Sequence, residues 1–331
     1  MPEFSIIVPV YNRPEEVREL LETLTRQTYQ DFEVLIVEDG STVLARDTVS
    51  KFQDQLEIHY FFKENEGQGF ARNYGYARSN GHYLIVFDSD CLIPEHYLET
   101  VHHFLQVHQV DAYGGPDTDH PSFTPVQKAI SHVMTSFFTT GGIRGRKKHV
   151  GHYHPRSFNM GIRKEVFQQT NGYLIPFMGE DLEFSTRIIK SGFKTALIPG
   201  AFVYHKRRTS LVKFFKQLKY FGRARVNLTR FHPDQLSLIH LFPFFFAFGL
   251  ILSVIMGSIG LGIGKIGLAG YAIYFLLIFM EGLIKSGSLI VAMLGPVVAL
   301  IQLFGYGYGL IYEWVRKLRG IDPNTRYIEL Y

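Results

Sequence analysis

The C-terminal third of the chain carries almost no charge, and this limits what it can fold into more than any other feature. Between residues 234 and 313 the charged side chains are those of Lys265, Glu281 and Lys285. The stretches 235–264 and 286–312 have no charge, and each is longer than the roughly 20 residues that a helix needs to cross a bilayer. The stretch 266–284 contains Glu281 and is a weaker candidate. The sequence therefore predicts two to three transmembrane helices within 236–312 and a tail over 313–331.

The number of crossings decides the topology. Three crossings would put the basic residues of the tail (Arg316, Lys317 and Arg319) opposite the basic residues that precede the first helix. Lys and Arg are usually enriched on the cytoplasmic side alone. Two crossings with one interfacial or re-entrant segment remove this conflict, and the sequence leaves both arrangements open.

A basic segment, 206–235, precedes the apolar region. Residues 206–230 contain nine Lys or Arg and no Asp or Glu. Apolar residues at helical spacing predict an amphipathic helix here: Leu211, Phe214, Phe215, Leu218 and Phe221. We expect 206–235 to be an interfacial segment that lies on an anionic membrane surface, and the alternative is that the helix packs on its own domain.

The first 205 residues mix apolar and charged residues as a soluble domain does. The net charge of the chain, +4, is too small to indicate nucleic acid as a partner. A single cysteine, Cys91, excludes an intramolecular disulfide and a multi-cysteine metal site. The N-terminal MPEFSIIVPVYN has too short an apolar run for a signal peptide. We therefore expect this domain on the cytoplasmic side of a membrane.

Apolar runs alternate with helical patterns along this domain. The predicted strands are 4–10, 32–37, 57–62 and 83–87, and the predicted helices are 14–27, 43–52 and 69–78. Such alternation implies right-handed crossovers, so we expect an α/β fold with a Rossmann-like, mostly parallel sheet and helices on both faces. Further on, the pattern predicts helices at 95–107 and 181–190, a strand at 159–162, and a closing strand pair at 195–198 and 201–204.

Two aspartates follow the fourth predicted strand. If the extended conformation persists through Ser89, Asp88 and Asp90 point to the same side. Two such carboxylates repel each other unless a cation lies between them, and oxygen ligands suit Mg²⁺ or Mn²⁺. Because Mg²⁺ usually binds through one or two carboxylates and substrate phosphates, we expect a nucleoside diphosphate as the partner. In such sheets, ligands bind beyond the carboxyl ends of the strands.

Five motifs follow one another in this domain: VPVYNR (8–13), VEDGS (37–41), NEGQGFARN (65–73), FDSD (87–90) and GED (179–181). As an ordered set they resemble the motifs of family-2 inverting glycosyltransferases, which have the GT-A fold. The resemblance spans about 4–205, and it identifies 1–205 as the expected catalytic domain. The implied donor is a nucleotide-diphosphate sugar, with UDP or GDP as the nucleotide.

The resemblance also implies roles for single residues in donor binding. Pro9, Tyr11 and either Glu38 or Asp39 would line the pocket for the base and ribose. The family usually has two aspartates where this chain has Glu38 and Asp39, so the division of labour there stays open. Arg72 would lie near the nucleotide. A purely structural role is the alternative for each, and Asn12 could cap the first helix.

The metal and the chemistry follow from the same resemblance. Asp90 would bind Mg²⁺ or Mn²⁺, with Asp88, which would also contact the ribose and sugar, and His205 as further candidate ligands. The metal would neutralise charge on the departing diphosphate. Asp181 resembles the general base, and Glu180 is its neighbour; the alternative is that both stabilise the start of their helix.

The implied reaction is a single displacement with inversion at a glycan or polyprenyl-linked acceptor. GGIRGRKKH (141–149) is interpreted as a loop over the diphosphate. A processive polysaccharide synthase is an alternative, but such proteins usually carry Gln-x-x-Arg-Trp, whereas Gln217 is followed by LKYFGR and the single tryptophan is Trp314. A non-catalytic membrane scaffold is the second alternative, against which the intact aspartates argue.

Overall fold

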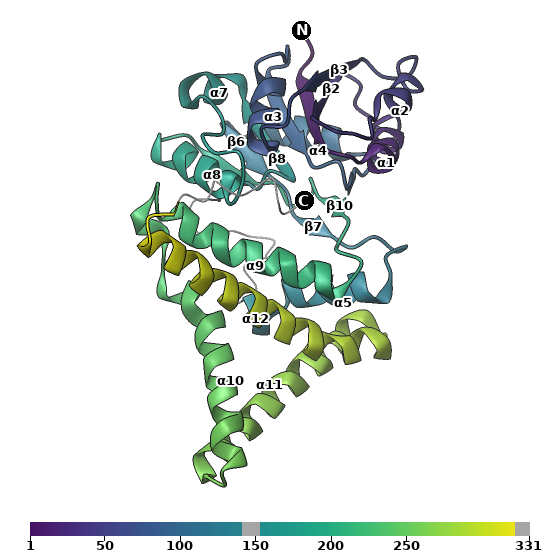
Figure 1. Cartoon of the computed structure of the whole chain (residues 1–331). Coiled ribbons are helices and arrows are strands. Elements are labelled where there is room, and N and C mark those ends of the chain that lie inside the picture. Colours follow the sequence, from purple (N-terminus) through teal and green to yellow (C-terminus); the bar gives the residue numbers. More distant parts are fainter. Residues whose placement is uncertain (141–152, 322–331) are drawn as a thin grey trace. The chain divides into compact units, whose positions relative to one another are not determined.

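The computed structural model describes residues 1–140 and 153–321 of the 331-residue chain (Figure 1). These residues form two compact units, one of 1–120 with 153–206 and one of 121–140 with 207–321. Residues 121–140, which lie within the predicted catalytic domain of 1–205, group with the second unit. The predicted loop at 141–149 and the end of the tail lie outside the described residues.

A seven-stranded sheet forms the centre of the first unit, in the order β3-β2-β1-β4-β8-β6-β9. The strands are β1 (Phe4–Val10), β2 (Phe32–Asp39), β3 (Ile58–Lys63), β4 (Tyr83–Phe87), β6 (Ala112–Gly114), β8 (Asn159–Arg163) and β9 (Thr195–Leu197). Strands β1 to β4 are parallel to their neighbours among these four, and β8 is antiparallel to β4 and β6. The prediction of a mostly parallel sheet is confirmed.

Helices cover both faces of this sheet: α1 (Pro14–Leu24), α2 (Arg46–Ser50), α3 (Gln68–Tyr76), α4 (Tyr97–Val107), α7 (Lys164–Thr170) and α8 (Glu180–Lys190). Successive side chains of a strand point to opposite faces, so alternate residues of β1 enter two separate cores. Ile6 and Val8 pack with α1 and α4, and Ile7 packs with α3 and α8. The predicted two-sided α/β layering is therefore confirmed.

A smaller sheet of the same unit contains β5 (Cys91–Leu92), β10 (Val203–His205) and β7 (Asp117–Thr118), in the order β5-β10-β7. The prediction that 195–198 and 201–204 form a strand pair is wrong. After β9 the chain turns, with the Ala201 N–H donating to the Ile198 carbonyl (3.1 Å), and β10 pairs with β5 and β7 instead. This return brings His205 beside the end of β4.

The second unit is helical: α5 (Pro125–Thr135), α6 (Phe137–Thr140), α9 (Leu211–Leu228), α10 (Phe242–Ser258), α11 (Gly262–Ser286) and α12 (Leu289–Leu318), with short 3₁₀ turns at Pro233–Gln235 and Leu238–Leu241. Three segments are long and apolar enough to cross a membrane: Leu238–Ser258, Gly262–Ser286 and Leu289–Leu318. The three predicted candidate segments are thus present as helices. Helix α5 was not predicted from the sequence.

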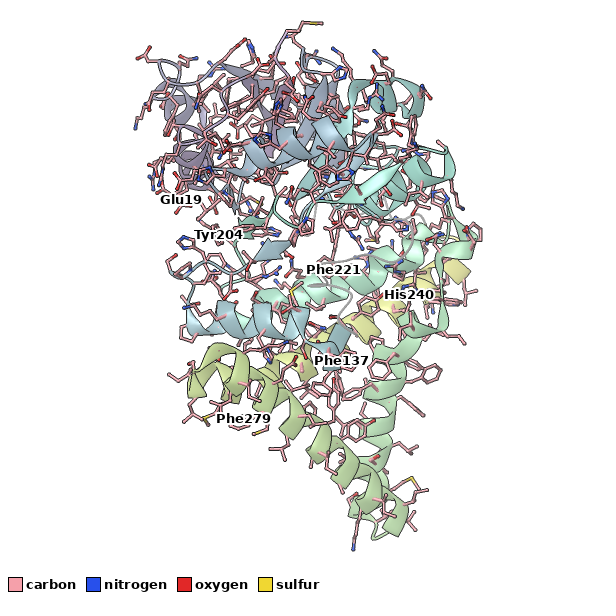
Figure 2. The ribbon with its side chains drawn as sticks, turned by 180° about the vertical axis from the view of Figure 1, so that it is seen from behind. Glu19, Phe137, Tyr204, Phe221, His240 and Phe279 are labelled. Atoms are coloured by element: carbon pink, nitrogen blue, oxygen red, sulfur yellow. The ribbon has the colours of Figure 1, made fainter. Side chains whose placement is uncertain are left out.

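The three apolar helices differ in what surrounds them. Helices α10 and α11 form an antiparallel pair whose apolar side chains point outward along their length, as Figure 2 shows. Helix α12 instead lies alongside α9 (Figure 1) and buries a continuous face that runs from Val291 to Arg316. Phe214 and Leu218 of α9 belong to the same apolar cluster as Val298 of α12. The apolar face of α9 therefore packs within its own unit.

Candidate active site

The site begins where β4 ends at Phe87. The extended conformation does not persist through Ser89, contrary to our premise for the two aspartates. The chain turns, and the Cys91 N–H donates to the Asp88 carbonyl (3.0 Å). The two carboxylates therefore separate and take different partners, Asp88 with Arg72 and Asp90 with Arg13 and His205.

Asp90 lies between two basic side chains. Its Oδ2 accepts from Nη1 of Arg13 (2.7 Å), and its Oδ1 lies 3.1 Å from Nε2 of His205. Burial alone would lower the pKa of Arg13, but the ion pair with Asp90 outweighs it, and the pKa of Arg13 is raised. Arg13 thus stays charged beside the carboxylate.

His205 is held from several sides in the first unit. The ring of Phe158 stacks on its imidazole, with 5.1 Å between ring centroids. Nδ1 faces the Asp117 carboxylate at 3.9 Å, while Nε2 faces Asp90. A histidine that binds a metal ion usually has a carboxylate or carbonyl beside its other ring nitrogen, and Asp117 lies in that position when Nε2 is the ligand atom. His205 is therefore oriented for a ligand role.

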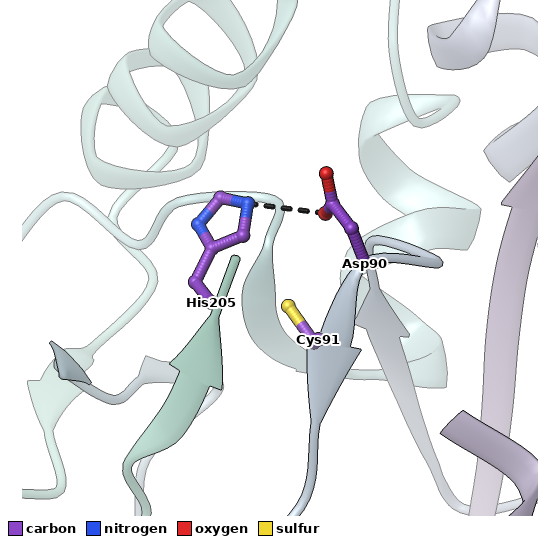
Figure 3. A group of neighbouring side chains, drawn as sticks. All are labelled: Asp90, Cys91 and His205. Carbon is purple, nitrogen blue, oxygen red and sulfur yellow. Dashed lines mark ion pairs between the residues drawn. The ribbon is translucent and has the colours of Figure 1, made fainter. Parts of the chain in front are cut away.

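Asp90, Cys91 and His205 offer one ligand atom each within 4.8 Å of one another (Figure 3). The carboxylate suits Mg²⁺ and Mn²⁺, and the imidazole is a common ligand of divalent transition metals. The donor set therefore fits a divalent cation. Asp88 does not belong to this group of three. Burial raises the pKa of the Cys91 thiol well above its usual value.

Arg72 connects the donor side of the site to the predicted base. This guanidinium is almost fully buried; Nη2 donates to Asp88 Oδ1 (2.9 Å) and Nη1 to Glu180 Oε1 (3.0 Å). It also lies over the Tyr173 ring, 5.3 Å from its centroid. Burial opposes its charge, but the neighbouring acidic groups raise its pKa. Arg72 is thus a fixed positive charge that both carboxylates share.

The two acidic residues of the GED motif have different surroundings. Glu180 is buried and accepts hydrogen bonds from Gln68 and Arg72, and burial raises its pKa despite Arg72. Asp181 is partly exposed at the start of α8, and its Oδ2 lies 3.5 Å from Nη1 of Arg156. Asp181 is therefore the one that an acceptor hydroxyl could reach. The predicted base role of either residue stays a prediction.

Glu38 and Asp39 also differ in their hydrogen-bond partners. Asp39 accepts from the backbone N–H groups of Glu66 (3.0 Å) and Gly67 (2.9 Å) and pairs with Lys63, so it shapes the turn before α3. Glu38 Oε2 accepts from the Ala45 N–H (3.0 Å) and the Tyr60 hydroxyl (2.8 Å).

The two carboxylate oxygens of Glu38 differ in their hydrogen bonding. Oε1 of this buried side chain has no hydrogen-bond partner among the described residues. Burial and the neighbouring Glu38 raise the pKa of Tyr60 to about 12, so the Tyr60 hydroxyl remains a donor at neutral pH. Of the two acidic residues, Glu38 is thus the better candidate for contacting the donor.

Pro9 and Tyr11 lie at the carboxyl end of β1. Pro9 is next to Val37 in the β1–β2 register, and the Tyr11 side chain is 40% exposed. Asn12 does not cap α1, so that alternative is wrong. Instead its Oδ1 accepts from the backbone N–H groups of Thr42 and Val43 (2.8 Å each), with φ at +55°. Asn12 thus holds the loop after β2 beside Tyr11.

Several residues of the site were missed from the sequence: Arg13, Cys91, Asp117, Arg156 and Phe158. Arg13 stands inside the VPVYNR motif, and Cys91 follows FDSD, so adjacency to a motif was an available signal for these two. Asp117 lies in the two-residue strand β7, Arg156 and Phe158 lie just before β8, and only the fold brings these three residues close.

Several curated relatives match about a third of the chain. An uncharacterized glycosyltransferase of Rickettsia bellii is 37% identical over 31% of this chain and 15% of its own length. Glycosyltransferase GlyA of Streptococcus pneumoniae is 34% identical over 33% of this chain and 16% of its own length. The chain thus spans about a sixth of the length of these two relatives.

Longer matches extend over both units. Dolichyl N-acetyl-alpha-D-glucosaminyl phosphate 3-beta-D-2,3-diacetamido-2,3-dideoxy-beta-D-glucuronosyltransferase of Methanococcus voltae is 25% identical over 76% of this chain and 81% of its own length. Mannosyltransferase PcManGT of Pyrobaculum calidifontis, solved with GDP-mannose and Mn²⁺, matches with a TM-score of 0.58 and 16% identity, covering 97% of this chain and 88% of that one. The predicted GT-A fold is confirmed by this similarity.

The model of a protein family described as Glycosyl transferase family 2 matches residues 5–170. That span is half of the 331 residues and includes four of the five motifs, up to FDSD. The chain therefore belongs to glycosyl transferase family 2.

Proposed function

We propose that this protein transfers a sugar from a nucleotide-diphosphate sugar to a hydroxyl of a glycan or polyprenyl-linked acceptor, with inversion. The observation that carries the proposal is that the two aspartates of FDSD lie in two charged sets: Asp90 pairs with His205, and Asp88 pairs with Arg72, which also binds Glu180 of the GED motif. Fixed positive charge and a cation ligand set thus lie beside a candidate base. The family membership supports the reaction class.

Asp90 and His205 would hold a divalent cation, Mg²⁺ or Mn²⁺. Such an ion supplies positive charge that stabilises a departing diphosphate. Arg13 and Arg72 add positive charge to the same region, and preorganised charges of this kind stabilise developing negative charge without reorganisation. The similarity to a mannosyltransferase solved with GDP-mannose and Mn²⁺ makes that pair the first to test.

The nucleotide would bind at the carboxyl ends of β1 and β2. The exposed ring of Tyr11 offers a face for the base, and the buried Oε1 of Glu38 offers an acceptor for a base or ribose donor. Pro9 lines the same edge. Both UDP and GDP carry N–H groups that a carboxylate can bind, so the site agrees with either.

Asp181 would act as the general base. An attacking hydroxyl must lose its proton as the glycosidic bond forms, and a carboxylate within hydrogen-bond reach can accept it. Asp181 is partly exposed, whereas Glu180 is buried and bonded to Arg72. Glu180 would then position Arg72, and Arg156 would orient Asp181.

The second unit would attach the protein to a membrane, with the first unit on the cytoplasmic side. Helices α10 and α11 expose many large apolar side chains along their length, as lipid-facing helices do. Helix α12 packs along α9, which carries the exposed Lys213 and Lys216, and charged groups avoid the hydrocarbon core. We therefore place α10 and α11 across the bilayer and the α9–α12 pair at its surface.

Binding of nucleotide diphosphates to the detergent-purified protein tests this function. UDP and GDP are titrated with and without Mn²⁺, for the wild type and for Asp90→Ala. We expect one nucleotide to bind in a Mn²⁺-dependent way and this dependence to be lost in Asp90→Ala. If folded protein binds neither nucleotide, the transferase proposal is wrong, and a scaffold role becomes the better account. The anomeric configuration of the product, read by NMR, tests inversion.

A further inference from the structure

A small strand pairing brings a sulfur atom to the cation site. In the antiparallel pair of β5 and β10, Cys91 lies directly opposite His205. Opposite residues of such a pair have their side chains on the same face, with Cβ atoms about 4.5–5.5 Å apart. Asp90 immediately precedes Cys91, so three potential ligands come from one turn and one strand end.

The side chains of these three residues point toward one another (Figure 3). The Asp90 carboxylate, the Cys91 thiol and the His205 imidazole offer ligand atoms within 4.8 Å of each other. The thiol is fully buried and donates a weak hydrogen bond to the Phe158 carbonyl (3.6 Å). Because the Phe158 ring also stacks on His205, one residue orients two members of the group.

The mixed chemistry of these donors favours a different class of ion from Mg²⁺. Carboxylate, carbonyl and water oxygens suit Mg²⁺ and Mn²⁺, whereas sulfur and imidazole nitrogen suit Zn²⁺ and Co²⁺. We propose that Asp90, Cys91 and His205 form a binding site for a thiophilic divalent cation of the Zn²⁺ class. This inference rests on the proposed role of Asp90 and His205 as cation ligands, and it adds a third ligand that the motif does not include.

Binding in this mode exchanges a proton for the metal. The S–H bond of Cys91 breaks, its proton passes to solvent, and a sulfur–metal bond forms without any change in oxidation state. Solvent or the donor fills the remaining position of a tetrahedral ion. Because both classes of ion use Asp90 and His205, a thiophilic ion excludes Mn²⁺, and we expect Zn²⁺ to compete with Mn²⁺ for the protein.

Co²⁺ titration of the full-length protein in detergent tests the site, because Co²⁺ bound to thiolate absorbs in the near ultraviolet through charge transfer. The chain has a single cysteine, so such a band can come only from Cys91. We expect the band to saturate at one Co²⁺ per chain and to disappear when Zn²⁺ is added. The inference is overturned if Co²⁺ binds without this band or if Co²⁺ does not bind. This test uses the wild-type protein alone.

The variants Cys91→Ala and Cys91→Ser provide a second test of the sulfur ligand. Removing a direct ligand should weaken Co²⁺ binding, measured calorimetrically, by at least the roughly 10- to 100-fold that loss of an outer-shell partner costs. Mn²⁺ affinity, measured by electron paramagnetic resonance, should fall much less, so the preference for Co²⁺ over Mn²⁺ decreases. An unchanged preference in either folded variant contradicts a thiolate ligand.

The failure of this inference can be told apart from failure of the proposed function. Mn²⁺-dependent nucleotide binding without a Co²⁺–thiolate band rejects the sulfur ligand alone. A Co²⁺–thiolate band in a protein that binds no nucleotide rejects the transferase proposal and retains the site. Asp90→Ala serves as the shared control, because it should lose both Co²⁺ and Mn²⁺.

Discussion

At the residue scale, Arg72 connects most of the charged groups of the site. Its guanidinium is almost fully buried between Asp88 and Glu180. An arginine offers several N–H donors in a fixed plane, so it can serve two carboxylates at once, which a lysine ammonium cannot do with the same geometry. The position of Asp88 therefore depends on the residue that also fixes Glu180.

We expect Arg72→Met to destabilise the first unit strongly, because it leaves Glu180 buried without its cation. Breaking a buried ion pair from one side costs about 3–5 kcal/mol. Adding Glu180→Gln should recover part of this loss, since the amide needs no counter-charge. Urea unfolding of the two variants and of Glu180→Gln alone measures the coupling. Equal stabilities of Arg72→Met and the double variant would show that the ion pair is not the cause.

The different surroundings of Asp181 and Glu180 lead to a kinetic prediction. Asp181→Asn should lower kcat by about 10²- to 10⁴-fold, the usual contribution of a general base, while nucleotide affinity stays near that of the wild type. Glu180→Gln is the matched control, and it should weaken nucleotide binding through Arg72. Sugar transfer and nucleotide binding are measured on the same samples. A larger loss of kcat in Glu180→Gln than in Asp181→Asn would reverse the assignment.

The sequence could predict which residues gather at this site but not how they pair. Periodicity placed Asp88 and Asp90 after a strand, and the motifs added Arg72 and His205. The pairing of Asp90 with Arg13, and of Cys91 with His205, depends on a turn at Ser89 and on the return of β10. Neither the turn nor the return of β10 can be recognised from the hydrophobic pattern, because β5 has two residues and β10 has three, which is too short for a periodicity.

At the element scale, α9 and α12 pack through glycines. A Cβ atom added to Gly222 would overlap the Tyr306 carbonyl oxygen, and one added to Gly309 would overlap the Lys219 carbonyl oxygen. Around this contact the carboxylate of Glu313 is fully buried among three arginines: Arg223, Arg230 and Arg316. Close backbone approach and buried charge together specify this helix pair.

Gly222→Ala should therefore lower the thermal stability of the detergent-solubilised protein, with an overpacking cost of about 1–3 kcal/mol. Gly270→Ala on α11 is the matched control, because no described atom lies within 4 Å of the added Cβ. There the better helix propensity of alanine should leave stability unchanged or raise it by up to about 1 kcal/mol. Equal melting temperatures for the two variants would contradict tight α9–α12 packing.

Helix prediction succeeded where the apolar pattern was long and failed where other signals were required. The apolar face of α9 was read correctly, but its packing partner could not be, because lipid and a neighbouring helix bury the same side chains. Helix α5 was missed, although Thr124 and Gln127 form a capping box at its start and Pro125 occupies its first turn. The Pro- and Gly-rich residues before it masked this signal.

At the scale of the whole molecule, the proposed membrane attachment raises the question of how many of the three apolar helices would cross the bilayer. Hydropathy treats α10, α11 and α12 alike. Burial distinguishes them. In the most apolar 18 residues of the first two segments 11% is buried within the structure, against 44% in the segment that forms α12. Helix α12 is thus partly covered by its own unit, and its neighbour α9 carries exposed basic residues, which suits the membrane surface. Two crossings also keep the basic residues before and after the apolar region on one side, as the positive-inside rule prefers.

Single cysteines in a Cys91→Ala background can test this topology. Lys213→Cys lies on α9, Gly262→Cys at the connection between α10 and α11, and Arg319→Cys just after α12. In sealed vesicles of known orientation, a membrane-impermeant maleimide should label Lys213→Cys and Arg319→Cys from the cytoplasmic side and Gly262→Cys from the other side. Labelling of Arg319→Cys from the same side as Gly262→Cys would mean that α12 crosses the membrane. In that case the α9–α12 pair could not lie at the surface, because the charges on α9 would have to enter the hydrocarbon core together with α12.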